Sequence, residues 1–324
     1  MTQFIYFITN PGNEKLLKYE MLEHFKGRLN FSYSKPGLCT YKNMQEDLSL
    51  EDIRNLDIIF ARSLGESRGI LSKNDLFNEI KSLTKTYKEI TFTQIPLDPN
   101  NLEEDLDLVS ELESFRPKGP GLSPMQGSVI KVEEDKYFLG IELKDKFSSP
   151  PGKYFYKLSK SDSPSRAYHK IKESFLLLNI PNNTSLVCAE FGCAPGGSSK
   201  FLLENNHTVY GVDPAKMDDT IIENKNFHFI NLPMQKVKRK ELPEKIDLLI
   251  SDVNLEPLDV LKIFTHLFQD NSPHKAIITL KIPKAKMLTQ KNEWDKLLQK
   301  LGYSNISYVQ LSSHRSECVV IGEK

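Results

Sequence analysis

The segment from Ser185 to Gly197, which reads SLVCAEFGCAPGG, runs from an apolar stretch directly into a turn rich in glycine. The residues after it, SSKFLLEN, place apolar side chains at helical spacing. This order predicts a buried strand, a tight turn and a helix. In a doubly wound α/β sheet, such a turn lets backbone N–H groups approach a ligand at the N-terminus of the helix. Taken alone, the segment is also compatible with a buried strand and turn that bind nothing.

A second apolar strand, from Thr208 to Val212, ends in Asp213, which lies 21 residues after Gly192. An acidic residue about 20 residues beyond such a turn is the usual partner of a ribose diol. The glycines do not follow the G-x-G-x-x-G pattern, however, and Pro195 is an unusual insertion in a turn that cradles a pyrophosphate. A nucleoside with a small polar tail, such as S-adenosylmethionine, therefore fits the segment better than NAD.

Four further segments carry a charged residue where such a sheet has its functional edge. They are the helix pattern SRAYHKIKE with Lys170, and the strand patterns IDLLISDVN with Asp252, AIITLKIP with Lys281 and HRSECVVI with Glu317. Open α/β sheets bind their ligands outside the carboxyl ends of the strands. The charged residues therefore predict a cleft at this edge of the sheet.

Three of these four residues have a purely structural interpretation as well. Lys170 would lie on the solvated face of an amphipathic helix, and Asp252 would cap a helix that follows its strand. Glu317 would be a charged residue that prevents an edge strand from pairing with another chain. Lys281 differs from them, because a lysine is rarely found within a buried apolar strand unless it has a functional role. The four residues taken together favour a functional site.

The motifs SRAYHK, FGCAPGG, SDVN, LKIP and RSECVV resemble, in order and spacing, those of the FtsJ-like ribose 2′-O-methyltransferases, over roughly residues 161–324. The resemblance implies a Rossmann-like α/β domain that uses S-adenosylmethionine and no metal. It also implies that a tetrad of Lys170, Asp252, Lys281 and Glu317 transfers the methyl group. The cofactor-binding positions that it implies are Glu190, Gly192, Cys193, Ala194, Pro195, Gly196, Gly197, Asp213 and Asp252.

Two positions depart from the family pattern. Glu190 stands where the family more often has Asp, and either carboxylate can serve there. The strand FHFINLPM lacks the acidic residue that commonly contacts the adenine near Pro233, so we assign no residue to that contact.

The chemistry of the reaction explains why such a tetrad is needed. A ribose 2′-hydroxyl is a poor nucleophile at neutral pH, so its attack on a methyl group needs a base and a fixed approach. A lysine serves as a base only if its pKa falls, which a neighbouring cation and partial burial bring about. We therefore expect Lys170 to ease the deprotonation of Lys281, the general base, while Asp252 and Glu317 orient the amines.

The front half alternates strand and helix patterns in a way that suggests a small α+β sandwich of the ferredoxin-like kind. Strands are expected at FIYFI, LCTY, DIIFAR, EITFTQIPL and YFLGIE, and helices at residues 13–25 and 73–85. With NPGNEKLLKYEM and LDIIFARS, this layout resembles bacterial 23S rRNA ribose 2′-O-methyltransferases. In those enzymes a ferredoxin-like domain and a THUMP RNA-binding domain precede an FtsJ-like domain. We expect the corresponding domains at residues 1–70, 71–147 and 165–324, with a linker at 148–164.

Composition bears on the compartment and on the partner. The 324 residues contain no apolar run of 18, and MTQFIYFITN lacks the charged region and cleavage site of a signal peptide, so we expect a cytoplasmic protein without membrane contact. Its four cysteines have no metal-ligand spacing and are expected to be reduced. The resemblance implies an RNA substrate, a cytidine of 23S rRNA near the peptidyl-transferase loop, for a protein expected to be a monomer.

Charge is spread unevenly although the net charge is zero. Residues 151–324 hold 24 Lys and Arg against 19 Asp and Glu, so this half is about +5 and the front half about −5. An acidic front half departs from the basic THUMP regions of the family. Two basic clusters are expected to contact phosphates, unless they are merely solvated faces: Lys236, Lys238, Arg239 and Lys240, and Lys281, Lys284 and Lys286.

Two further functions remain open. One is methylation of tRNA, since the tetrad separates ribose from base methylation but does not separate tRNA from rRNA. The other is a silent RNA-binding or assembly protein that keeps the methyltransferase fold without turnover. The complete tetrad and the glycine turn favour an enzyme.

Overall fold

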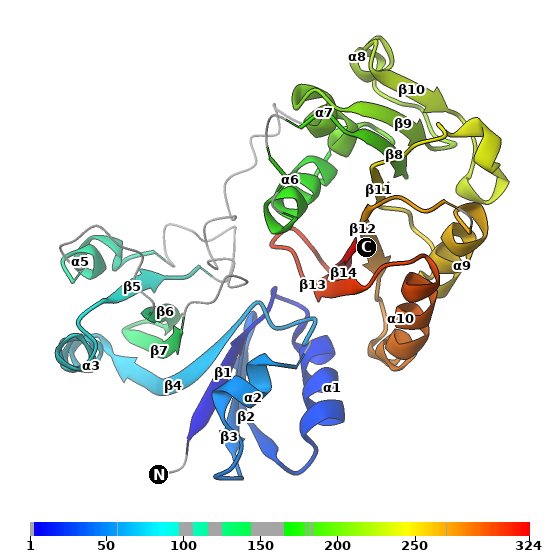
Figure 1. Ribbon diagram of the computed structural model, residues 1–324. Coiled ribbons are helices and arrows are strands. Elements are labelled where there is room, and N and C mark those ends of the chain that lie inside the picture. The colour runs from blue at the N-terminus through cyan, green and yellow to red at the C-terminus, as the bar shows by residue number, and fades with distance from the viewer. Residues whose placement is uncertain are drawn as a thin grey trace. The chain divides into compact units, whose positions relative to one another are not determined.

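Two units make up the chain in the computed structural model, Met1–Lys157 and Leu158–Lys324 (Figure 1). The structure describes residues 3–56, 58–96, 106–115, 125–143, 165–178, 180–181, 184–269 and 271–324. The expected linker at 148–164 lies outside the described residues. Within the described part of the chain, no helix is long and apolar enough to cross a membrane.

A single seven-stranded sheet runs through the first unit in the order β2-β3-β1-β4-β7-β6-β5. Its strands are β1 (Phe4–Ile8), β2 (Leu29–Lys35), β3 (Leu38–Asn43), β4 (Ser63–Ser72), β5 (Ile90–Gln94), β6 (Met125–Glu133) and β7 (Lys136–Leu143). The helices described with them are α1 (Glu14–Phe25), α2 (Leu50–Arg54), α3 (Lys73–Thr86) and α5 (Val109–Glu113).

The first four strands form one antiparallel part of the sheet, and the ferredoxin-like assignment of residues 1–70 stays a prediction. The elements follow the order β1-α1-β2-β3-α2-β4, and the strands pair antiparallel in the order β2-β3-β1-β4. The sheet then continues from β4 into β7, so the domain boundary expected at residue 70 falls inside β4. The THUMP-like assignment of residues 71–147 stays a prediction.

The prediction of a strand at DIIFAR is wrong. Residues 58–62 form a turn and irregular backbone, and the strand β4 begins only at Ser63. The carboxylate of Glu20, buried on α1, accepts hydrogen bonds from the backbone N–H groups of Ile59 and Phe60 at 2.8 and 2.9 Å. These two N–H groups therefore bond to a side chain instead of a neighbouring strand, which an apolar pattern cannot reveal.

The second unit contains a seven-stranded sheet in the order β10-β9-β8-β11-β12-β14-β13 (Figure 1). Its strands are β8 (Val187–Phe191), β9 (Thr208–Val212), β10 (Phe227–Ile230), β11 (Leu248–Ser251), β12 (Lys275–Lys281), β13 (Asn305–Val309) and β14 (Glu317–Glu323). Its helices are α6 (Ala167–Leu177), α7 (Gly197–Glu204), α8 (Asp219–Ile222), α9 (Pro257–Leu267) and α10 (Lys291–Lys300), with short 3₁₀ turns at 234–236, 239–241 and 285–290.

The order of these strands places the candidate site. Strands β10, β9, β8, β11 and β12 are parallel, and β14 inserts antiparallel between β12 and β13. The chain leaves β8 toward β9 on one side, yet β11 pairs with β8 on the other side. In doubly wound sheets, ligands bind outside the carboxyl ends of the strands at such a reversal. The predicted strand-turn-helix at 185–204 lies at this point, which confirms the α/β fold predicted for this half.

Candidate active site

The four charged residues predicted from the sequence come together from four elements. Lys170 lies on the buried face of α6, with only 9% of its surface exposed. Asp252 follows β11 directly, and Lys281 is the last residue of β12. Glu317 begins β14 and stands opposite Lys281 in the antiparallel register. Because β14 runs against its neighbours, its first residue lies at the carboxyl edge of the parallel strands.

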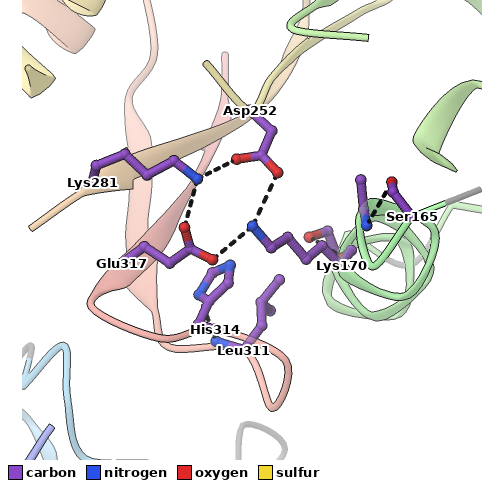
Figure 2. A network of polar contacts seen from close by, with 9 residues as sticks. Ser165, Lys170, Asp252, Lys281, Leu311, His314 and Glu317 are labelled. Carbon is purple, nitrogen blue, oxygen red and sulfur yellow. Dashed lines mark hydrogen bonds and ion pairs between the residues drawn. The ribbon is translucent and has the colours of Figure 1, made fainter. Parts of the chain in front are cut away.

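The four side chains form a closed ring of alternating charge (Figure 2). The Nζ atom of Lys170 lies 2.9 Å from one oxygen of Asp252 and 2.6 Å from one oxygen of Glu317. The Nζ atom of Lys281 lies 2.6 Å from the other oxygen of each carboxylate. Each carboxylate oxygen therefore meets one ammonium group, and the ring as a whole carries no net charge.

Electrostatics within the ring contradict one expectation. Burial by itself lowers the pKa of Lys281, but the charges and hydrogen bonds of Asp252 and Glu317 outweigh burial and raise this pKa above its usual value. Burial likewise raises the pKa of each carboxyl group, and the two lysines outweigh it, so both of these pKa values are lowered. The prediction that Lys281 loses its proton more easily than a free lysine is therefore wrong for the ring as it stands. Two carboxylates in contact with Lys281 outweigh one neighbouring cation.

A fifth charged residue, which the sequence patterns did not reveal, connects the segments that carry Lys170 and Glu317. Glu173 lies one turn after Lys170 on α6 and is 4% exposed. Both of its oxygens accept the backbone N–H of Ser312 at 3.0 Å, and the Ser312 hydroxyl donates to one of them at 2.7 Å. Ser312 lies in the loop that leads into β14 and Glu317. This contact therefore holds α6 against that loop. The signal in the sequence was a Glu at position i+3 from Lys170, on the same helix face.

The glycine turn after β8 lies directly against the end of β11. Gly192 has a φ of +81°, and a Cβ atom there would come within 2.7 Å of the backbone oxygen of Asp252. Gly196 has a φ of +119°, and a Cβ atom there would meet Ile221 of α8 at 2.9 Å. A side chain at Gly196 would therefore press on α8. Both positions require glycine for backbone conformation and for space.

Asp213 ties the turn to the end of β9. Its two oxygens accept the backbone N–H groups of Ala194 at 3.1 Å and Ala215 at 2.8 Å. A carboxylate oxygen has more than one lone pair, so these bonds leave acceptor capacity for hydroxyl groups of a ligand. The side chain of Cys193 is buried against Met217, so only its backbone is available to a ligand. Gly197 packs closely on Ser165, and Pro195 is exposed.

Glu190, near the end of β8, has an unfilled acceptor. It is 1% exposed, and one oxygen accepts the hydroxyl of Ser199 on α7 at 2.6 Å. Its other oxygen makes no hydrogen bond of normal length with any residue that the structure describes. Burial raises the pKa of Glu190 to about 7. A buried acceptor without a partner is costly, and an ammonium or hydroxyl group of a ligand would satisfy it. This residue therefore fits a cofactor that carries such a group.

Comparison with known proteins agrees with this geometry. Residues 164–306 match the family model of the FtsJ-like methyltransferases. The chain is 26% identical over 165 residues to a protein named ribosomal RNA large subunit methyltransferase M from Actinobacillus succinogenes, covering 48% of this chain and 44% of that protein. It is 24% identical over 143 residues to the protein of the same name from Chromohalobacter salexigens, covering 42% and 37%. The chain thus matches less than half the length of these relatives.

A solved structure of a ribosomal RNA methyltransferase from Plasmodium falciparum aligns with 19% identity over 49% of this chain and 97% of that one. Its TM-score of 0.38 is too low to support an argument. The family match ends before β14, so Glu317 is placed in the site by its ion pairs with Lys170 and Lys281 and by its register with β12. Residues 164–306, which match the family model of the FtsJ-like methyltransferases, hold Lys170, the glycine turn, Asp252 and Lys281.

Proposed function

We propose that this protein is an S-adenosylmethionine-dependent RNA ribose 2′-O-methyltransferase that acts on ribosomal RNA of the large subunit, with a cytidine of 23S rRNA as the expected target. The observation that carries the proposal is the ring of Lys170, Asp252, Lys281 and Glu317 at the carboxyl edge of an FtsJ-like domain. The names of the relatives, which are ribosomal RNA methyltransferases, support the class of substrate.

The residues around the glycine turn fit the proposed cofactor. The unfilled oxygen of Glu190 suits the amino group of the methionine part, and Asp213 at the end of β9 suits the ribose hydroxyls. Glycine at positions 192 and 196 lets the turn pack against the end of β11 and against α8, which keeps its backbone at the carboxyl edge, where a cofactor would bind. When bound, S-adenosylmethionine supplies a methyl group on a sulfonium, which becomes a neutral thioether as the methyl group leaves.

The ring would handle the proton of the ribose hydroxyl. Lys281 must first release a proton, because its carboxylate neighbours keep it charged. A cation brought against the ring, together with exclusion of water by bound RNA, would lower its pKa and favour that release. The neutral Nζ of Lys281 would then accept the proton of the ribose hydroxyl, while the bound cofactor would supply the methyl group to the ribose oxygen. Asp252, Glu317 and Lys170 keep this nitrogen in place. A positioned base of this kind contributes roughly 10²- to 10⁴-fold to the rate.

The remaining parts of the chain are assigned by the same proposal. We place RNA recognition in the front unit, with a ferredoxin-like domain up to residue 70 and a THUMP-like domain at 71–147, and the linker at 148–164. We infer a monomer that works in the cytoplasm, where ribosomal RNA is available. The complete ring argues against a silent assembly protein.

The decisive experiment maps 2′-O-methyl groups in total RNA from cells with and without the gene. We expect one site in 23S rRNA to disappear and to return with the wild-type gene but not with a Lys281→Ala gene. A lost methyl group on a base, or in tRNA only, would contradict the proposed substrate.

A further inference from the structure

A surface groove with a volume of about 730 Å³ lies in the second unit, away from the ring. It is lined by Val237, Lys238, Arg239, Lys240, Leu242, Glu244, His266, Leu267, Gln269 and Asn271. One wall comes from the segment that leads from β10 into β11, and the other from the end of α9 and the residues before β12. Both walls precede the first residues of parallel strands. The groove therefore lies at the amino edge of the sheet, opposite the edge that carries the ring.

The central cation of this groove is held by neutral partners. The guanidinium group of Arg239 donates to the backbone oxygens of Pro243 at 2.7 Å and Glu244 at 2.6 Å, and more weakly to that of Leu242 at 3.4 Å. The same guanidinium group lies 5.9 Å from the centroid of the aromatic ring of Phe268. Carbonyl oxygens fix the position of a guanidinium group but do not cancel its charge. Arg239 thus presents a fixed positive charge.

Two further cations flank Arg239. Lys238 and Lys240 are exposed, and neither forms an ion pair with any residue that the structure describes. Glu244 is the one carboxylate among the groove residues, against three basic side chains and His266. The ring at the opposite edge has two lysines and two carboxylates, so its charge is balanced. An excess of cations in a groove attracts a polyanion.

We propose that this groove binds the sugar-phosphate backbone of the RNA substrate at a point remote from the methylated ribose. The inference rests on the proposed function, which makes RNA the substrate. A ribosomal RNA fragment is far longer than the site around the ring, so a second contact can add affinity without new chemistry. The acidic balance of the front half is a further reason to look for a phosphate contact in the second unit.

The test compares two full-length variants with the same change in charge. Lys238→Glu/Lys240→Glu reverses the groove, whereas Lys296→Glu/Lys300→Glu reverses two exposed lysines on α10 that do not line it. Binding to an in vitro transcript of 23S rRNA is titrated at several salt concentrations. We expect the groove variant to bind roughly tenfold more weakly, with a salt slope smaller by about two, because each lost phosphate contact removes about one. The α10 variant should keep wild-type values.

Cofactor titration and thermal melting of both variants show whether the second unit is intact. If Lys238→Glu/Lys240→Glu melts early, Lys238→Gln/Lys240→Gln replaces it, with a smaller loss expected in the same direction. If the groove variant and the α10 variant bind the transcript with equal affinity, the proposal is overturned. A wild-type protein that binds the transcript through the groove but transfers no methyl group supports the groove and contradicts the proposed function.

Discussion

The two edges of the sheet in the second unit differ in whether their cations are paired with carboxylates. At the carboxyl edge, each lysine of the ring lies within 2.9 Å of two carboxylates, and the charges balance. At the amino edge, carbonyl oxygens hold Arg239, and the flanking lysines have no ion pair with the described residues. A balanced ring fixes atoms for a reaction, whereas an excess of positive charge gives affinity for an anion. Substitutions at each edge should therefore affect different measurements.

The largest expected effect is on the rate of methyl transfer. Lys281→Ala removes the proposed base and should lower the single-turnover rate by at least about 10²-fold. Cofactor affinity should remain close to wild type, because Glu190 and Asp213 lie on other strands. Rapid-quench methylation of a 23S rRNA transcript measures the rate, and calorimetry measures the affinity. An unchanged rate removes Lys281 from the mechanism.

The ring should also act as one unit. Asp252→Ala should slow transfer about as much as Lys281→Ala, and the double variant should be little slower than either, because groups that act together are not additive. The same rapid-quench assay gives all three rates. Losses that multiply would show that the two residues contribute independently.

Stability should depend on pH through the ring. The lowered pKa values of Asp252 and Glu317 stabilise the fold above their usual values of 3.8 and 4.5, and this contribution is lost as pH falls through the folded values. The raised pKa of Lys281 stabilises the fold fully below 10.5, and this contribution is lost as pH rises through the folded value. Lys281→Met should therefore lower the free energy of unfolding by about 2 kcal/mol near neutral pH and by less at both extremes. Urea unfolding from pH 3 to 11 tests this, and a cost independent of pH would contradict it.

A smaller effect is expected at Glu173. Glu173→Gln keeps the shape of the side chain but weakens its contact with Ser312, so Lys170 and Glu317 should be held less firmly. We expect kcat to fall by about tenfold with little change in KM, since precise placement affects the reacting geometry most. A fall in thermal stability with unchanged kcat would make Glu173 structural only.

The smallest effect concerns cofactor affinity. Because the pKa of Glu190 is about 7, the affinity for a cofactor with an ammonium group should rise as pH increases from 6 to 8. Glu190→Gln should bind more weakly and lose this dependence. Calorimetric titration at several pH values measures both, and a wild-type affinity that is flat across this range would remove Glu190 from the cofactor site.

The sequence predicted the second unit far better than the first. Apolar strands that end at Lys281 and just before Asp252 favour a buried parallel sheet, because strands that alternate with helices pair in parallel. In the first unit, β2 reads LNFSYSK and has mixed exposure, so it gives no clear pattern, and β4 reads SLGESRGILS with two glycines. Both strands were missed because neighbours in the sheet, not their own composition, make them strands.

The site shows the same limit. Motif order located the four residues of the ring, but not the Glu173 contact with Ser312, which joins residues 139 positions apart. The direction of the Lys281 pKa was wrong because sequence gives no distances, and two contacts of 2.6 Å decide it.

The most direct test of the account uses one measurement. The wild-type protein and Lys281→Ala are each incubated with S-adenosylmethionine carrying a labelled methyl group and a 23S rRNA transcript, which is then digested to nucleosides and analysed by mass spectrometry. We predict labelled 2′-O-methylcytidine from the wild-type protein and at most about one hundredth of that initial rate from the variant. Label on a base, or equal rates from both proteins, would contradict the claim that the ring methylates a ribose.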